Sequence, residues 1–190
     1  MNLDQQLGRR IDELVADTRR TLAAEGVTRH SLARVREALI ELGRETSLFD
    51  PQRFPLPAGG KARMYVLHAD PDQSMTLYVN VCGAGVVSPP HDHATWAVIA
   101  GVVGEERNTF YRIVDAGAEP VGSKAVVAGE AVALMPDDVH SIDTLQQPLV
   151  MTLHFYGRSL PAQTDRRAFP EQGAATAYAP QPEIVAWTRC

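Results

Sequence analysis

Two histidines lie one residue apart in the segment SPPHDHATWAVIAG, residues 88–101. In an extended chain, side chains at positions i and i+2 point to the same side, so His91 and His93 project together and Asp92 points away. Two imidazoles on one face are a frequent pair of metal ligands, although surface pairs of this kind also occur without a metal. The spacing alone leaves both interpretations open.

A second segment, GEAVALMPDDVHSI, supplies a third imidazole. It runs from Gly129 through an apolar strand and a Pro-Asp-Asp turn to His140, which begins the next extended stretch. A barrel that pairs the two segments would bring His140 beside His91 and His93. Three neutral imidazoles leave the positive charge of a divalent ion uncompensated, so such a site would attract anionic ligands, a thiolate among them.

A third segment, PLVMTLHFYG, places Thr152, His154 and Tyr156 at alternate positions of one expected strand. The three side chains therefore share a face. A hydroxyl, an imidazole and a phenol in a row can form a hydrogen-bonded relay in which each group orients the next. The alternative is a barrel strand with polar residues on its solvent side.

The elements around these residues fall into three parts. Residues 1–55 contain two amphipathic helical patterns, with Thr28 or Ser31 as the cap of the second, and are expected to pack on a barrel. Residues 56–160 contain short strands rich in valine and aromatic residues, separated by turns, which indicates an antiparallel sandwich or barrel. Residues 161–190 are polar and proline-containing and are expected to wrap the barrel within one overall domain.

Composition excludes several classes of protein. The chain of 190 residues carries a net charge of −5 and has no long basic block, which argues against nucleic acid or an anionic membrane as a partner. No apolar stretch is long enough to span a membrane. With two cysteines, Cys82 and Cys190, a disulfide framework is not expected, and a reducing cytoplasm is the simpler interpretation. The sequence does not indicate an oligomeric state.

The first two segments resemble the two sequence motifs of the cupins. Glycines flank the His91–His93 pair, and the second segment has glycine, proline and then His140. The resemblance implies an all-β fold, a double-stranded β-helix (jelly-roll) barrel, here with an N-terminal pair of α-helices. Many cupins have a glutamate four or five residues after the second histidine, where this chain has Ala97 and Val98. A three-histidine site without a carboxylate is therefore expected.

With the third segment, the chain resembles the thiol dioxygenases, the family of cysteine dioxygenase and 3-mercaptopropionate dioxygenase, over residues 60–170. Its TLHFY row is similar to their Ser-x-His-x-Tyr row, with threonine in place of serine. The resemblance implies that ferrous iron (Fe2+) is the cofactor and that the three histidines bind it. It further implies that Tyr156 lies near bound substrate or dioxygen, supported by Thr152 and His154.

The implied substrate is a small thiol carboxylic acid, oxidised by O2 to a sulfinate. Arginine suits its carboxylate because it donates two parallel hydrogen bonds. By the resemblance, Arg63 falls at the carboxylate-binding arginine of cysteine-type members, and Arg166 and Arg167 fall near that of mercaptopropionate-type members. If both sites reach the pocket, a dicarboxylate such as mercaptosuccinate becomes a candidate beside cysteine and 3-mercaptopropionate. A surface position for either site is the alternative.

Two other classes of function stay open from the sequence. Zinc also accepts three imidazoles plus a water, which it activates for hydrolysis. A cupin that binds a small ligand without catalysis is the second alternative, although it has no need for an aligned row at Thr152, His154 and Tyr156.

Overall fold

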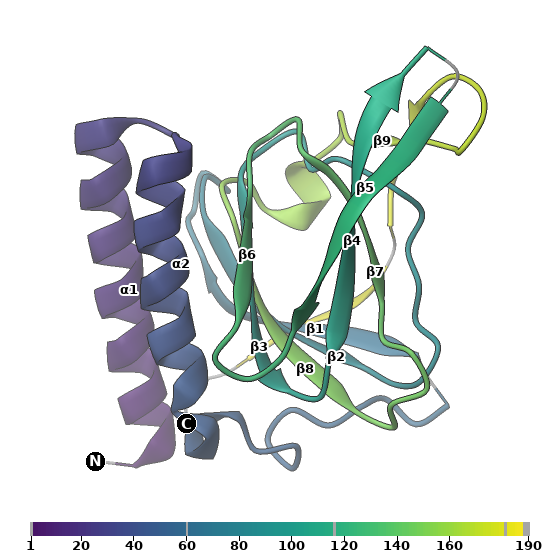
Figure 1. Cartoon of the computed structure of the whole chain (residues 1–190). Helices are drawn as coiled ribbons and strands as arrows, with labels where there is room; N and C mark the ends of the chain where they lie inside the picture. The colour runs from purple at the N-terminus through teal and green to yellow at the C-terminus, as the bar shows by residue number, and fades with distance from the viewer. Residues whose placement is uncertain (1, 60, 116, 181, 188–190) are drawn as a thin grey trace.

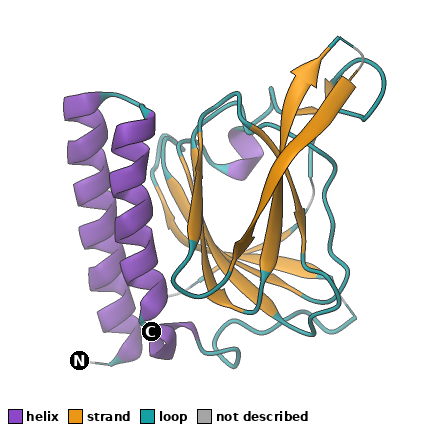
Figure 2. Ribbon diagram, in the orientation of Figure 1, coloured by secondary structure: helices purple, strands orange, loops and turns teal. Residues whose placement is uncertain are grey.

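The computed structural model describes residues 2–59, 61–115, 117–180 and 182–187, and shows a helical hairpin beside a β-barrel (Figures 1 and 2). The helices are α1 (Leu3–Glu25), α2 (Arg29–Arg44) and two 3-10 turns, η1 (Thr46–Phe49) and η2 (Leu160–Ala162). The strands of the barrel are β1 (Ala62–Ala69), β2 (Thr76–Cys82), β3 (Ala97–Val103), β4 (Glu106–Val114), β5 (Gly117–Val126), β6 (Ala131–Leu134), β7 (Val139–Asp143) and β8 (Val150–Tyr156). The last described strands are β9 (Arg167–Ala168), β10 (Thr176–Ala177) and β11 (Glu183–Ala186).

Two facing sheets form the barrel. One sheet has the order β11-β1-β2-β8-β3-β6 and the other the order β5-β4-β7. Strands distant in sequence are neighbours, as β8 lies between β2 and β3 and pairs antiparallel with both. This crossover pattern is the double-stranded β-helix, the barrel architecture of cupins, and confirms the fold class expected from the sequence.

The helical hairpin covers the outer face of the larger sheet. Helix α2 packs against β3 and β6 (Figure 1). Apolar side chains of both helices join those of the sheet in one buried cluster. Thr28 is the cap of α2, where its side chain accepts a hydrogen bond from the backbone N–H of Ser31. The structure thus selects one of the two caps that the sequence offered.

Strand β8 is buried on both faces, which decides the environment of the Thr152 row. Leu153 and Phe155 pack outward into the cluster shared with the helices, whereas Tyr156 belongs to a second apolar cluster inside the barrel. Thr152 and His154, on the same side as Tyr156, are 0% and 4% exposed. The polar row therefore faces the barrel interior, and the interpretation of a solvent-facing row is wrong.

A motif glycine is explained by close packing in β3. A Cβ atom on Gly101 would overlap the backbone carbonyl of Val127, and β3 shifts its register against β8 between Gly101 and Val103. The neighbouring Gly104 has a φ of 71°, a left-handed conformation that glycine adopts without strain. These two glycines allow the sharp turn between β3 and β4. Strand β4 then begins at Glu106, whose side chain is buried.

The C-terminal segment wraps the barrel, as β9 pairs with β10 and β11 adds to β1 in parallel. Cys190 lies outside the described residues. Among those that are described, no helix combines the length and the apolar character needed to cross a bilayer.

Candidate functional site

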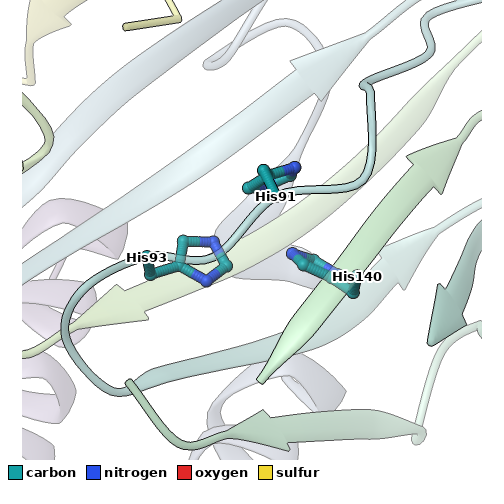
Figure 3. A group of neighbouring side chains, drawn as sticks. All are labelled: His91, His93 and His140. Atoms are coloured by element: carbon teal, nitrogen blue, oxygen red, sulfur yellow. The ribbon is translucent and has the colours of Figure 1, made fainter. Parts of the chain in front are cut away.

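The three predicted imidazoles meet inside the barrel. His91, His93 and His140 are each at most 4% exposed, and one ligand atom from each lies within 4.8 Å of the others. Their ring centroids are 4.7–5.1 Å apart. Figure 3 shows the rings turned toward a common space, two from the segment before β3 and one from β7. This is a three-histidine cluster of the kind that holds a divalent metal ion.

Backbone pairing holds the cluster together. The N–H of His91 donates to the carbonyl of His140 over 2.8 Å, and the N–H of His140 donates back over 3.0 Å. His91 also forms an isolated bridge with Ala168, so the segment is held from two sides rather than within a regular strand. His91 and His93 therefore lie in a loop rather than in a regular strand, and Ala94, with a φ of 53°, turns the chain after His93.

Hydrogen bonds fix the orientation of two rings and leave metal-binding nitrogens free. The Nδ1 of His91 lies 2.9 Å from the carbonyl oxygen of Pro89, and the Nδ1 of His140 lies 2.8 Å from Asn108 Oδ1. Both acceptors require a proton on Nδ1, which leaves Nε2 with a lone pair. The buried His140 Nε2 and His93 Nδ1 have no hydrogen-bond partner among the described residues. Buried imidazole nitrogens without a partner, in a cluster whose ligand atoms lie within 4.8 Å of one another, fit a metal ion.

Burial keeps these imidazoles neutral. It lowers the pKa of His91 to about 3, and it lowers the pKa values of His93 and His140 well below the usual value. The Arg166 guanidinium acts in the same direction on all three. Neutral imidazole is the form that binds metal.

The lowered pKa values predict that the metal-free protein loses stability on acidification. Below about pH 6.5 the unfolded histidines take up protons while the folded ones stay neutral, so proton uptake favours unfolding. We expect the free energy of unfolding to fall from pH 6.5 to pH 5 by up to about 1.4 kcal/mol per pH unit for each of the three histidines. Denaturant unfolding in EDTA measures this slope. His91→Gln should make it shallower, and an unchanged slope in that variant would contradict the assignment.

The Thr152 row forms the relay predicted from its spacing. Thr152 Oγ1 lies 2.9 Å from His154 Nε2, and His154 Nδ1 lies 2.7 Å from the Tyr156 hydroxyl. The Tyr156 ring is 5.3 Å from that of His93. Burial raises the pKa of Tyr156, so the phenol keeps its proton at neutral pH. The row thus holds a neutral phenol beside the histidine cluster.

Sequence reasoning missed a buried acid next to this row. Glu106, at the start of β4, is 0% exposed, and its carboxylate accepts hydrogen bonds from Asn108 Nδ2 over 3.0 Å and from Thr152 Oγ1 over 3.4 Å. Strand β4 also contributes Asn108, the partner of His140. A Glu-x-Asn pair on a strand after the first motif is the only sign the sequence offers, and it carries no metal-ligand spacing.

A cavity of about 350 Å³ opens onto the cluster. Besides the three histidines, its polar lining includes Ser88, Asn80, His154, Tyr156 and Arg166. The remaining wall is mainly apolar, and no aspartate or glutamate is among the described residues that line it. The cavity therefore offers one cationic group and no anionic one to a bound molecule.

Arg166 is the arginine that reaches this cavity. It is 4% exposed, and its Nε donates to the backbone carbonyl of Asp92 over 3.2 Å. Among the described residues its nearest acidic influence is Asp92, whose carboxylate is paired with Arg167 and acts on Arg166 only beyond ion-pair distance. Burial lowers the pKa of Arg166, yet a guanidinium stays charged at neutral pH. An unpaired buried cation is costly, and an anionic ligand would relieve that cost.

The other two arginines lie elsewhere. Arg63 forms an ion pair with Glu183 over 2.8 Å, hydrogen bonds to Tyr65, and is not among the described residues lining the cavity. Arg167 forms an ion pair with the buried Asp92 over 2.8 Å. The expectation that two arginine sites could serve one pocket is corrected to a single one, because Arg63 projects from the opposite face of β1 and Arg167 is occupied by Asp92.

Tyr178, which the sequence did not single out, covers part of the cavity. Its ring lies 5.0 Å from that of His91 and 5.2 Å from the guanidinium carbon of Arg166. A cation held over a phenol ring is stabilised by the ring's negative face. The C-terminal segment therefore both closes the cavity and holds Arg166 in place. Only the wrapping of this segment, established by β10, brings Tyr178 here.

Comparison with known proteins finds no matching family model. Among solved structures, the chain is similar to the DMSP lyase DddQ from Ruegeria pomeroyi DSS-3, with 20% identity over 55% of this chain and 51% of that one, at a TM-score of 0.42. It is also similar to an oxalate oxidase in complex with glycolate (17% identity, 45% and 42% covered, TM-score 0.39). A third similar structure is the Cupin_2 domain of an XRE family transcriptional regulator from Enterobacter cloacae, with 13% identity over 51% of this chain and 96% of that one, at a TM-score of 0.39.

The aligned region spans about half the length of the lyase. At these TM-scores the likeness does not extend to function, which must come from the site itself. That site combines three neutral imidazoles, a neutral phenol and one unpaired guanidinium around a single cavity. Such a set can bind a divalent ion and hold a small anion beside it.

Proposed function

We propose that this protein is a non-heme iron(II) thiol dioxygenase, which uses O2 to convert the thiol of a small mercapto carboxylic acid to a sulfinate. The observation that carries the proposal is the joint presence, at one cavity, of the three-histidine cluster, the Tyr156 relay and the unpaired Arg166. A hydrolytic zinc site or a simple binding cupin has no use for all three.

His91, His93 and His140 would hold the iron, because one ligand nitrogen of each lies within 4.8 Å of the others and burial keeps the three rings neutral. The ion would supply the redox chemistry by which dioxygen reacts with a thiol, and its uncompensated charge would favour the thiolate form of the substrate. Because the cluster contains no carboxylate, its ligands would leave the positive charge of the ion uncompensated. An anionic sulfur ligand would be attracted by that charge.

Arg166 would fix the other end of the substrate. Its free guanidinium nitrogens can donate two parallel hydrogen bonds to one carboxylate, and the Tyr178 ring keeps them in the cavity. The cavity has no described acidic side chain to pair with the ammonium of cysteine, and no second arginine for another carboxylate. We therefore rank 3-mercaptopropionate above both cysteine and mercaptosuccinate as a substrate.

Tyr156 would orient the reacting groups. Its hydroxyl is held by His154 at one side, and its neutral phenol lies in the cavity wall beside His93. In the overall reaction, R–SH and O2 give R–SO2H. The sulfur loses four electrons, both oxygen atoms end on it, and the S–H proton leaves as the acid ionises. A fixed polar group and a fixed carboxylate confine the sulfur to one position, which lowers the entropy cost of the reaction.

Oxygen uptake by iron-loaded protein with a panel of thiols tests the proposal. We expect uptake with 3-mercaptopropionate to exceed that with cysteine or mercaptosuccinate, and 18O2 to place two labelled atoms in the sulfinate. Tyr156→Phe should lower kcat by about 10- to 100-fold, since it removes one positioned hydrogen-bonding group. The matched control is Tyr111→Phe, whose hydroxyl bonds Ser141 outside the cavity. Zinc-dependent hydrolysis without oxygen uptake would overturn the proposal.

A further inference from the structure

Glu106 lies between the metal cluster and the tyrosine relay, and touches the supports of both. Its Oε1 accepts from Asn108 Nδ2 over 3.0 Å, and Asn108 Oδ1 lies 2.8 Å from His140 Nδ1. Its Oε2 accepts from Thr152 Oγ1, which leads to His154 and Tyr156. The fully buried carboxylate thus joins the two halves of the site in one chain of hydrogen bonds.

Glu106 has no Lys or Arg partner among the described residues. The ring nitrogen Nε2 of His154 lies 3.6 Å from its Oε2. A buried carboxylate without a cation is stabilised only by the hydrogen bonds that it accepts. It cannot donate one while ionised, so every neighbour must present a donor to it.

This restriction sets the direction of the hydrogen bonds on the metal side. Asn108 must turn its Nδ2 toward Glu106, which leaves its Oδ1 toward His140. His140 must then carry its proton on Nδ1 and keep a lone pair on Nε2, the nitrogen that lacks a partner among the described residues. The carboxylate therefore selects the tautomer of His140 that can bind a metal through Nε2.

The same restriction sets the direction on the relay side. Thr152 donates its hydroxyl proton to Glu106, so its oxygen accepts from His154 Nε2–H. With its proton on Nε2, the His154 imidazole has a lone pair on Nδ1, which accepts the hydrogen bond of the Tyr156 hydroxyl over 2.7 Å. The phenol proton then points at His154, and the phenol oxygen presents its lone pair to the cavity as an acceptor.

Asn80 offers a competing arrangement. Its Nδ2 lies 3.4 Å from His154 Nε2 and would require an unprotonated nitrogen there. The Thr152 bond to the same nitrogen is shorter, at 2.9 Å, and an amide can reverse its two ends whereas a carboxylate cannot become a donor. The Glu106 restriction therefore prevails, and it requires the Asn80 amide to reverse, with Oδ1 toward His154 and Nδ2 toward Cys82 Sγ, the opposite of their orientation in the structure.

We infer that Glu106 is a positioning residue that holds His140 and His154 in opposite tautomers, and so prepares a metal ligand and the Tyr156 hydroxyl together. The inference deepens the proposed function, on which its mechanistic meaning rests. The tautomers themselves depend only on the hydrogen bonds of the folded chain. Failure of the protein to oxidise any thiol would remove the proposed function and leave the tautomer assignment standing.

Nitrogen NMR of the metal-free, full-length protein labelled with 15N-histidine reads the tautomers directly. We expect Nδ1–H for His140 and Nε2–H for His154, with the six histidines assigned through single His→Gln variants. His154 in the Nδ1–H form in the wild-type protein would overturn the inference. Because this measurement needs no variant at Glu106, it can overturn the inference even where that variant fails to fold.

The Glu106→Gln variant is the second test of the inference. The carboxylate accepts hydrogen bonds from Asn108 and Thr152, whereas the glutamine amide can accept only one of them and must donate the other. The shorter bond from Asn108 should persist, so Thr152 should reverse and His154 should switch to Nδ1–H. We also expect Co2+ affinity, from titration of the visible absorption, to fall about tenfold or more as a support of His140 loses its charge. Glu105→Gln, which alters the neighbouring acid beside Arg107, is the matched control and should change neither. Unchanged tautomers with Co2+ affinity within twofold of wild type would overturn the inference.

Discussion

His140→Ala is expected to weaken the binding of Co2+ or Fe2+ by at least about 100-fold and to abolish thiol-dependent oxygen uptake. Loss of groups that merely support a ligand costs about 10- to 100-fold in metal affinity, so loss of a ligand itself costs more. His140 is fully enclosed, and its Nε2 lacks any other described partner. The substitution removes one of three donors from a site that has no carboxylate to replace it.

The measurement is a metal titration in the absence of substrate, with oxygen uptake as a second readout. His30→Ala is the control, because His30 is exposed near the start of α2 and lies outside the cluster. The two variants make the same chemical change in opposite environments. Metal affinity retained in His140→Ala would show that the three imidazoles are not a joint ligand set, and the proposed function would fall with it.

Much of the metal cluster could be predicted because the signals are local. The spacing of His91 and His93 places them on one side of the chain, and the turn before His140 begins a strand. In the structure the three histidines do meet, but for a different reason. The first two lie in a loop, and backbone hydrogen bonds between His91 and His140 hold that loop in place. Local patterns identify which residues meet, whereas the pairing of distant segments determines how they are held.

Glu106 and Asn108 were missed because nothing local distinguishes them from surface residues of a strand. Their partners lie on β7 and β8, and only the register of β4 against β7, in which Asn108 pairs with Ile142, places them in the interior. The first half of β5 is not evident from the sequence for a similar reason. Gly117 and Pro120 disfavour a strand locally, and the pairing with β4 overrides that preference.

The arginines show a further limit of the sequence. Alternation along β1 places Arg63 on one face or the other, but the sequence does not say which face lines the cavity. In the structure Met64 lines the cavity and Arg63 does not. Arg166 and Arg167 are adjacent, and the ion pair of Arg167 with Asp92 decides which of them points inward. Each of these choices depends on a partner far away in the chain.

Arg166→Gln is expected to lower kcat/KM for 3-mercaptopropionate by about 100-fold, mainly through KM, and not to weaken Co2+ binding, since Arg166 is a cation beside the cluster and not a ligand. A charge-assisted bidentate pair with a buried guanidinium is worth about 3 kcal/mol, and each 1.4 kcal/mol is a factor of ten. The glutamine keeps a polar side chain, but it is shorter, lacks the charge and cannot form the paired donor geometry of a guanidinium. A thiol without a carboxylate, such as 1-propanethiol, should be oxidised equally by both proteins, because it never used the arginine.

Arg63→Gln is the matched control for this prediction, since it makes the same change at the other candidate arginine. Arg63 is already paired with Glu183 and does not line the cavity, so its loss should leave KM for every thiol acid within about twofold of wild type. The opposite pattern, with KM raised by Arg63→Gln and unaffected by Arg166→Gln, would show that Arg63 on β1 binds the substrate carboxylate. Because both variants keep the three histidines, a change in KM without a change in metal affinity separates substrate binding from the integrity of the metal cluster.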